Sequence, residues 1–158
     1  MTTLTRRHHS GVTLIELIVT VAVLAILLSL AAPTFRDLLA AQRIRAAAHS
    51  LVSDLVLARS EAVKRGASVT LTPTAGNWAD GWRVTAGADA DILSAQNALG
   101  TGVAFSSGAP ASVVFDRNGR SGTTSTVRFQ LAYLNTPKRC VSLDPSGRPK
   151  SANTACPA

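Results

Sequence analysis

The chain has 158 residues, 46% of them hydrophobic and 4% aromatic, and its 16 Lys and Arg outweigh its 9 Asp and Glu to give a formal net charge of +7. This length suits one domain with an appendage, and the shortage of aromatic side chains predicts a small core rich in strands. His49 is the only histidine beyond residue 9, which argues against a metal site and against histidine-dependent nucleophilic catalysis.

Residues 12–32 form a hydrophobic run that, as a helix, is about one bilayer thick. Glu16 lies near its start, whereas Leu17–Ala32 contain no charged residue. A carboxylate within such a segment costs roughly 2.5–3.5 kcal/mol on insertion scales, so it is expected to have a partner and a function. A short basic leader that ends at Gly11 precedes the run.

Helical periodicity continues from Val12 to Arg65 with one interruption at Pro33, where we expect a kink. Beyond it, apolar residues recur at spacings of three and four, and Gly66 follows as a C-cap. This stripe predicts an amphipathic helix that covers a sheet. Its members are Leu38, Ala41, Ile44, Ala48, Leu51, Leu55, Ala58 and Ala62.

After Gly66 the apolar period changes to two, which predicts strands. Asn118-Gly119 and the run Asp144-Pro145-Ser146-Gly147 are turn signals, and residues 86–102 resemble a loop. The chain is therefore predicted to be an α+β protein. The expected strands are Ser68–Thr72, Gly81–Thr85, Val103–Ser106, Ser112–Asp116, Thr126–Ala132 and Arg139–Leu143.

Three interpretations of the N-terminal segment compete: a signal peptide cut near Ala32, a plain membrane anchor, and a prepilin segment cut after Gly11. Glu16 does not help a signal peptide, and a plain anchor gives no reason for an acid at its start. The third interpretation uses every feature. The basic leader stays cytoplasmic, Gly11 is the small residue before the scissile bond, and Glu16 lies five residues beyond it.

The run RRHHSGVTLIE, residues 6–16, resembles the class III leader and cleavage site of type IV pilins and type II secretion pseudopilins. The resemblance implies cleavage by a prepilin peptidase between Gly11 and Val12, and N-methylation of Val12, where pilins usually have Phe. It also implies that Glu16 pairs with the α-amino group of a neighbouring subunit during filament assembly.

Most of the chain resembles the family of minor pilins and pseudopilins that contains FimT and GspH, and it is closer to FimT. The matching pieces beyond the helix are NWADGW at residues 77–82, VFDRNGR at 114–120 and SGRPK at 146–150. Taken alone, Trp78 and Trp82 are better explained as packing residues than as a ligand platform.

The resemblance implies a pilin-like fold in which a long N-terminal helix packs on a small antiparallel sheet or sandwich. Residues 1–11 would be the cleaved leader, 12–35 the transmembrane and filament-core helix, 36–66 its amphipathic half, and 67–158 the β-rich domain with its basic tail. The protein would begin as a single-pass protein of the bacterial inner membrane with a periplasmic globular domain. It would then join other pilins in a filament at the cell surface.

Basic residues are concentrated at the C-terminal end, where seven lie from Arg117 onward against one acid. FimT-like minor pilins are associated with DNA capture in natural transformation through a Gly-Arg-x-Arg motif, and residues 147–150 match it with Lys in the last position. A phosphate contact tolerates that exchange. We therefore expect double-stranded DNA to bind through its phosphate backbone, without sequence preference. The expected DNA-binding residues are Lys138, Arg139, Arg148 and Lys150.

Cys140 and Cys156 would most simply form one disulfide in an exported protein. That bond would hold the segment of Arg148 and Lys150 near Lys138. In a cytosolic protein the two thiols would instead stay reduced.

Two structural roles compete with DNA binding: a GspH-like pseudopilin of a type II secretion system, and a minor pilin that supports pilus assembly without touching DNA. No nucleotide fingerprint, zinc spacing or catalytic constellation is present, so we expect neither an enzyme nor a cofactor.

Overall fold

The computed structural model describes residues 11–87, 91–106, 108–133 and 138–157. The chain divides into two compact units, Met1–Asp37 and Leu38–Ala158, and the helix α1 (Leu14–Arg65) contributes to both. The kink predicted at Pro33 concerns the join between these units and stays a prediction. Among the described residues no single helix has the length and hydropathy of a membrane span, whereas Leu14–Leu30 and Phe35–Arg65 meet that test as a pair.

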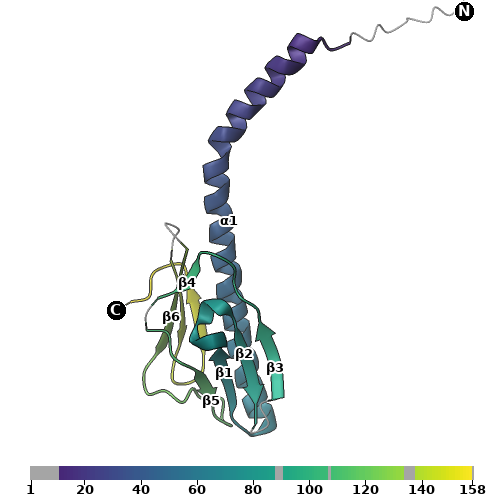
Figure 1. Ribbon diagram of the computed structural model, residues 1–158. Helices are drawn as coiled ribbons and strands as arrows, with labels where there is room; N and C mark the ends of the chain where they lie inside the picture. Colours follow the sequence, from purple (N-terminus) through teal and green to yellow (C-terminus); the bar gives the residue numbers. More distant parts are fainter. Residues whose placement is uncertain (1–10, 88–90, 107, 134–137, 158) are drawn as a thin grey trace, which may run out of the picture. The chain divides into compact units, whose positions relative to one another are not determined.

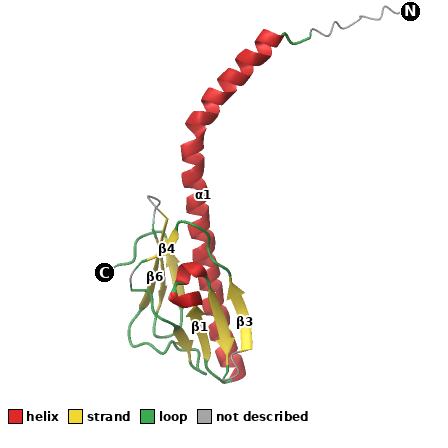
Figure 2. Ribbon diagram, in the orientation of Figure 1, coloured by secondary structure: helices red, strands yellow, loops and turns green. Residues whose placement is uncertain are grey.

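The second unit, called the body here, is an α+β structure with two antiparallel sheets beside the C-terminal part of α1 (Figures 1 and 2). One sheet has the strand order β3-β2-β1-β5 and the other β4-β6-β7-β8. Two short 3₁₀ turns, η1 (Thr74–Gly76) and η2 (Trp78–Asp80), lie between β1 and β2. The strands are β1 (Val69–Pro73), β2 (Trp82–Ala86), β3 (Asp91–Gln96), β4 (Val103–Phe105), β5 (Val113–Phe115), β6 (Val127–Tyr133), β7 (Arg139–Leu143) and β8 (Pro149–Ala152).

Six of these strands occur where the period of two predicts them, and β7 has the predicted bounds. The prediction of a loop over residues 86–102 is wrong in its middle, where β3 pairs with β2. A register shift between Val84 and Thr85 accompanies this pairing, and Ile92 of β3 is exposed. An edge strand with so little buried apolar surface has a weak alternating pattern, which explains the error.

Both sheets pack against the apolar stripe of α1. Its members from Ile44 to Ala62 belong to one buried cluster with side chains of β1, β2 and β5 from one sheet and β6 and β7 from the other. Trp82 is fully buried, and its indole N–H donates to the Asp54 carboxylate of α1 at 2.7 Å. The same carboxylate accepts from Ser94 Oγ of β3 at 2.9 Å. The helix is thus tied to the first sheet by a polar contact as well as by packing.

Both tryptophans serve packing, as the sequence predicts. Trp78 is 3% exposed and its ring lies edge-on to Phe129 at a centroid distance of 4.9 Å. Its indole N–H donates to the carbonyl of Pro110 at 2.7 Å. Because η2 carries Trp78 from the first sheet to Phe129 of the second, it helps to close the core between them.

We expect Ala58→Leu to destabilise the body by about 1–3 kcal/mol, because Ala58 is fully buried and extra methylenes overpack a filled site. Ala46→Leu is the matched control, since Ala46 is an exposed alanine on the same helix. Urea unfolding followed by tryptophan fluorescence would measure both, since Trp78 and Trp82 are buried in the body. Equal unfolding midpoints for the two variants would contradict the close packing of α1 on the sheets.

Candidate nucleic-acid interface

The segment with the Gly-Arg-Pro-Lys motif is a β-hairpin rather than a loop. β7 and β8 pair antiparallel, with Leu143 opposite Pro149 and Ser142 opposite Lys150. Because β8 is an edge strand of its sheet, the missing N–H of Pro149 costs no ladder hydrogen bond on the open side. The sequence predicts basic DNA-binding residues here but not the pairing of β8.

Alternation along the hairpin places Arg148 and Lys150 on the sheet face that turns away from the core. Val141 and Leu143 of β7 are buried, so Ser142 between them faces outward, and its partner Lys150 shares that side. Arg148 lies two residues before Lys150, so it points to the same side. Both residues are exposed.

Arg128 of β6 joins them through the strand register. It pairs with Ser142, which in turn pairs with Lys150, so the three residues form one row across the sheet. Two strand spacings separate Arg128 from Lys150, or about 10 Å. Arg128, Arg148 and Lys150 are called the outer basic face. Within the described ranges, none of their side chains has a hydrogen bond or ion pair.

Lys138 and Arg139 occupy the opposite end of the hairpin. Lys138 lies four residues before Ser142, which corresponds to about 13 Å of strand. Arg139 shares the core-facing side with Val141 and donates from Nη1 to Ser151 Oγ at 3.5 Å. Both residues line a hollow with the helical residues Ala41, Ile44 and Arg45 and with Asn153. The four predicted residues therefore form two pairs at opposite ends of the hairpin, and no single patch contains them all.

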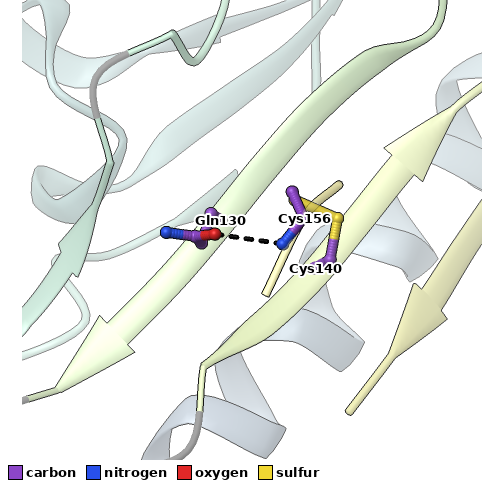
Figure 3. Close-up of a disulfide and its surroundings, with 3 residues drawn as sticks. All are labelled: Gln130, Cys140 and Cys156. Carbon is purple, nitrogen blue, oxygen red and sulfur yellow. Dashed lines mark hydrogen bonds between the residues drawn. A yellow bond between two sulfur atoms is a disulfide. The ribbon is translucent and has the colours of Figure 1, made fainter. Parts of the chain in front are cut away.

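Cys140 and Cys156 form the predicted disulfide, which fastens the chain after β8 to the sheet. In the register, Gln130 of β6 lies opposite Cys140, and its Oε1 accepts from the Cys156 backbone N–H at 3.0 Å (Figure 3). The tail is thereby held across the outer side of β7. Cys156 and Pro157 line a second hollow beside Arg128.

The turn between β7 and β8 is the predicted one. The Gly147 N–H donates to the Asp144 carbonyl at 2.9 Å, and Asp144 Oδ1 accepts from Ser146 Oγ at 2.5 Å and from the Arg148 N–H at 3.0 Å. The pKa of Asp144 is lowered by four neighbouring groups: the Ser146 hydroxyl, the N–H groups of Arg148 and Ser146, and the charge of Lys150. This carboxylate is therefore ionised at neutral pH, and it serves the turn's own backbone.

Gly147 also makes the closest tertiary approach of this turn. A Cβ built on it would lie 2.1 Å from the Gly119 carbonyl oxygen, in the turn after β5. Its φ of +80° is in the left-handed region that favours glycine. The Gly in the motif is thus required by the packing of two turns, independently of any ligand.

Arg128 is the residue that sequence reasoning missed. The predicted strand Thr126–Ala132 contains it, and alternation with the buried Phe129 and Leu131 would already have placed it on the outer side. What the sequence lacks is the register that sets Arg128 in one row with Lys150.

The N-terminal candidates lie before and within the first turn of α1. Gly11 and Val12 precede the helix, and the Glu16 N–H donates to Thr13 Oγ1 at 3.3 Å, so Thr13 caps the helix. The Glu16 side chain is exposed. Cleavage after Gly11, methylation of Val12 and the assembly role of Glu16 stay predictions.

A long N-terminal helix beneath two antiparallel sheets, with a disulfide-fastened C-terminal tail, defines the class of pilin-like proteins. Residues 47–147 match the family model described as type II transport protein GspH, and residues 6–32 match the prokaryotic N-terminal methylation motif. The chain belongs to the GspH family. A search among curated proteins finds no match.

Two crystal structures of the type IV minor pilin FimU from Pseudomonas aeruginosa share the fold. The first, in space group P21, has a TM-score of 0.62 and 19% identity and covers 70% of this chain and 89% of FimU. The second, in space group P65, has a TM-score of 0.56 and 21% identity and covers 68% of this chain and 91% of FimU. Membership in the family and the methylation motif imply processing by a prepilin peptidase, anchoring in the inner membrane, and association with other pilins.

We expect Gly147→Ala to destabilise the body by about 2–4 kcal/mol, the sum of positive-φ strain and a clash with the Gly119 carbonyl. Gly76→Ala is the matched control, because Gly76 has a φ of +78° and no atom near its Cβ position. Its cost should be only the backbone strain, about 1 kcal/mol. Urea unfolding compares the two, and equal losses would contradict the contact between the turns.

Proposed function

We propose that the chain is a minor pilin of a type IV pilus that binds double-stranded DNA non-specifically through its basic C-terminal region and supports DNA uptake in natural transformation. The observation that carries the proposal is the outer basic face, Arg128, Arg148 and Lys150. Three exposed cations lie there with no ion pair to any described residue, so their positive potential is available to a polyanion.

The geometry of the hairpin suits a phosphate backbone. Lys138 lies at the open end of the hairpin and Arg148 at its turn. The two ends are separated by six residues of strand, or about 20 Å. This is less than one turn of duplex DNA, so one duplex could contact both ends. Lys150 and Lys138 act as point charges, which positions a backbone without reading bases.

Several contacts of this kind give a weak, salt-sensitive affinity for each subunit. A filament that displays several copies would raise the overall affinity through avidity. The disulfide and the β7–β8 pairing hold the hairpin in shape before DNA arrives, which lowers the conformational entropy lost on binding.

A role in type II secretion is the second candidate, and the description of the matching family favours it. A GspH-like pseudopilin would use the same fold for assembly and would have no need of DNA. A pilus-assembly subunit without DNA contact would behave in the same way. The absence of DNA binding would favour these structural roles.

We expect Arg148→Gln/Lys150→Gln to weaken binding of labelled duplex DNA and to make the slope of log K against log salt shallower by about 2, since two phosphate contacts are lost. Lys138→Gln/Arg139→Gln should act in the same direction. Fluorescence anisotropy of the full chain in a non-ionic detergent, at several salt concentrations, measures both.

The control for this experiment is Arg43→Gln/Arg83→Gln, which removes the same net charge from exposed residues on α1 and β2. If this control weakens binding as much as Arg148→Gln/Lys150→Gln, the binding reflects net charge alone. If the wild-type chain does not bind at low salt, the DNA-binding proposal is wrong and the assembly roles become preferable.

Glu16 has a separate role in the proposal, as the partner of the α-amino group that cleavage creates on Val12 of a neighbouring subunit. We expect Glu16→Ala and Glu16→Gln to reduce the amount of the protein in sheared filaments, because the neighbour's amine would be left unpaired in an apolar core. Asp37→Ala is the control, an exposed acid on the same helix. Immunoblots of filament and membrane fractions measure the effect, and normal filament levels for both Glu16 variants would refute this role.

A further inference from the structure

The turn that carries Arg148 has a close counterpart elsewhere in the body. Residues 116–120 (DRNGR) and 144–148 (DPSGR) share the pattern Asp-x-x-Gly-Arg. In each turn the Gly N–H donates to the Asp carbonyl, at 2.8 and 2.9 Å, and the Arg N–H donates to Asp Oδ1, at 2.9 and 3.0 Å. Both glycines have positive φ, 72° and 80°. Arg120 and Arg148 are therefore equivalent positions of two similar turns.

These two turns lie against each other. The Cβ position of Gly147 falls 2.1 Å from the Gly119 carbonyl oxygen, so a residue with a side chain at position 147 could not approach so closely. Ser121 Oγ also donates to the Asp144 carbonyl at 3.0 Å and links the segment after the first turn to the second. We call residues 116–120 and 144–148 together the twin-turn joint. Arg120 and Arg148 each follow one of the touching glycines, so their backbones are neighbours.

Another arginine, Arg59, contacts the joint from α1. Arg59 Nε donates to the Gly119 carbonyl at 3.1 Å, and the Arg59 side chain lies within 3.2 Å of the Cβ position of that glycine. Arg59 is half-buried, which restrains its side chain. Its terminal Nη groups have no hydrogen bond to the residues that the structure describes.

The acids of the joint do not pair with these arginines. Asp116 Oδ1 accepts from the N–H groups of Asn118 and Arg120, as Asp144 Oδ1 does from Ser146 Oγ and the Arg148 N–H. The described part of the chain shows no ion pair to the exposed Arg120 and Arg148. With the exposed Arg117 of the first turn, four guanidinium groups thus outnumber two carboxylates that are engaged with turn backbone and with Ser146.

We propose that the twin-turn joint is a phosphate-binding site in which Arg120, with Arg59 beside it, shares the DNA backbone with Arg148. The inference rests on the proposed function and adds to it a site outside the C-terminal motif. Guanidinium groups from neighbouring backbone positions suit phosphate oxygens, which accept their N–H groups in pairs. Because the Gly119–Gly147 contact fixes the backbone of the joint, the conformational entropy lost on binding is mainly that of the arginine side chains.

The test compares Arg120→Gln with the control Arg83→Gln. Arg83 is an exposed arginine on β2, so both substitutions remove one positive charge from the surface. Anisotropy of a labelled duplex against the full chain in a non-ionic detergent is measured at several salt concentrations. Arg120→Gln should lower the affinity severalfold and make the salt slope shallower by about 0.9, the value of one lost phosphate contact. Arg83→Gln should leave the slope unchanged.

A double-mutant cycle separates a shared site from two independent charges. Arg120→Gln and Arg148→Gln should combine non-additively, because both contact the same short stretch of backbone, whereas Arg83→Gln and Arg148→Gln should combine additively. Urea unfolding should be unchanged in Arg120→Gln, since its side chain has no partner in the described part of the chain.

The outcomes distinguish this inference from the proposed function. If the wild-type chain binds DNA and Arg148→Gln weakens it, while Arg120→Gln behaves like Arg83→Gln, the joint is not a phosphate site and the C-terminal motif acts without it. If the wild-type chain does not bind DNA, the proposed function and the joint site fail together. A shallower slope for Arg120→Gln with the predicted coupling to Arg148 supports the joint.

Discussion

The rest of the body depends on the buried stripe of α1, because both sheets pack their apolar side chains against it. Leu51, Leu55, Ala58 and Ala62 are all fully buried, and their cluster includes inward side chains of each sheet. Two four-stranded sheets of this size bury little apolar surface by themselves. Small residues at positions such as Ala58 let the strands approach the helix closely. The Asp54 carboxylate, which accepts from Trp82 and Ser94, fixes the rotation of the helix relative to the first sheet.

The packing of the sheets on α1 also determines indirectly where the basic side chains lie. Inward side chains such as Val141 and Leu143 settle against the core, and alternation then forces Ser142, Lys150 and Arg128 to the outer side. The disulfide and the Cys156–Gln130 hydrogen bond hold the C-terminal tail on that same side (Figure 3). The positions of the cations are therefore a consequence of hydrophobic burial on the opposite face of the sheet.

A family whose members assemble into filaments places different demands on the two units. The N-terminal unit is apolar and exposed along its described length, which suits lipid or neighbouring helices. The body has the basic excess, and its fold is shared with FimU at under 25% identity. Such divergence on a common fold means that function has to be argued from the residues of each chain and not from the fold. In this chain exposed cations without an ion pair to the described residues lie on the β7–β8 hairpin and on the turn beside it.

The sequence by itself determined the long helix, most of the strands, both turns and the family. These features follow from local periodicity, from residues such as Gly and Pro with restricted or special backbone angles, and from a contiguous N-terminal motif. Only the tertiary structure decided which cations lie together. It separated Lys138 and Arg139 from Arg148, set Arg128 in one row with Lys150, and joined the two Asp-x-x-Gly-Arg turns through Gly119 and Gly147. The reason is that strand register and turn-to-turn contact arise from residues far apart in the chain, which no local pattern encodes.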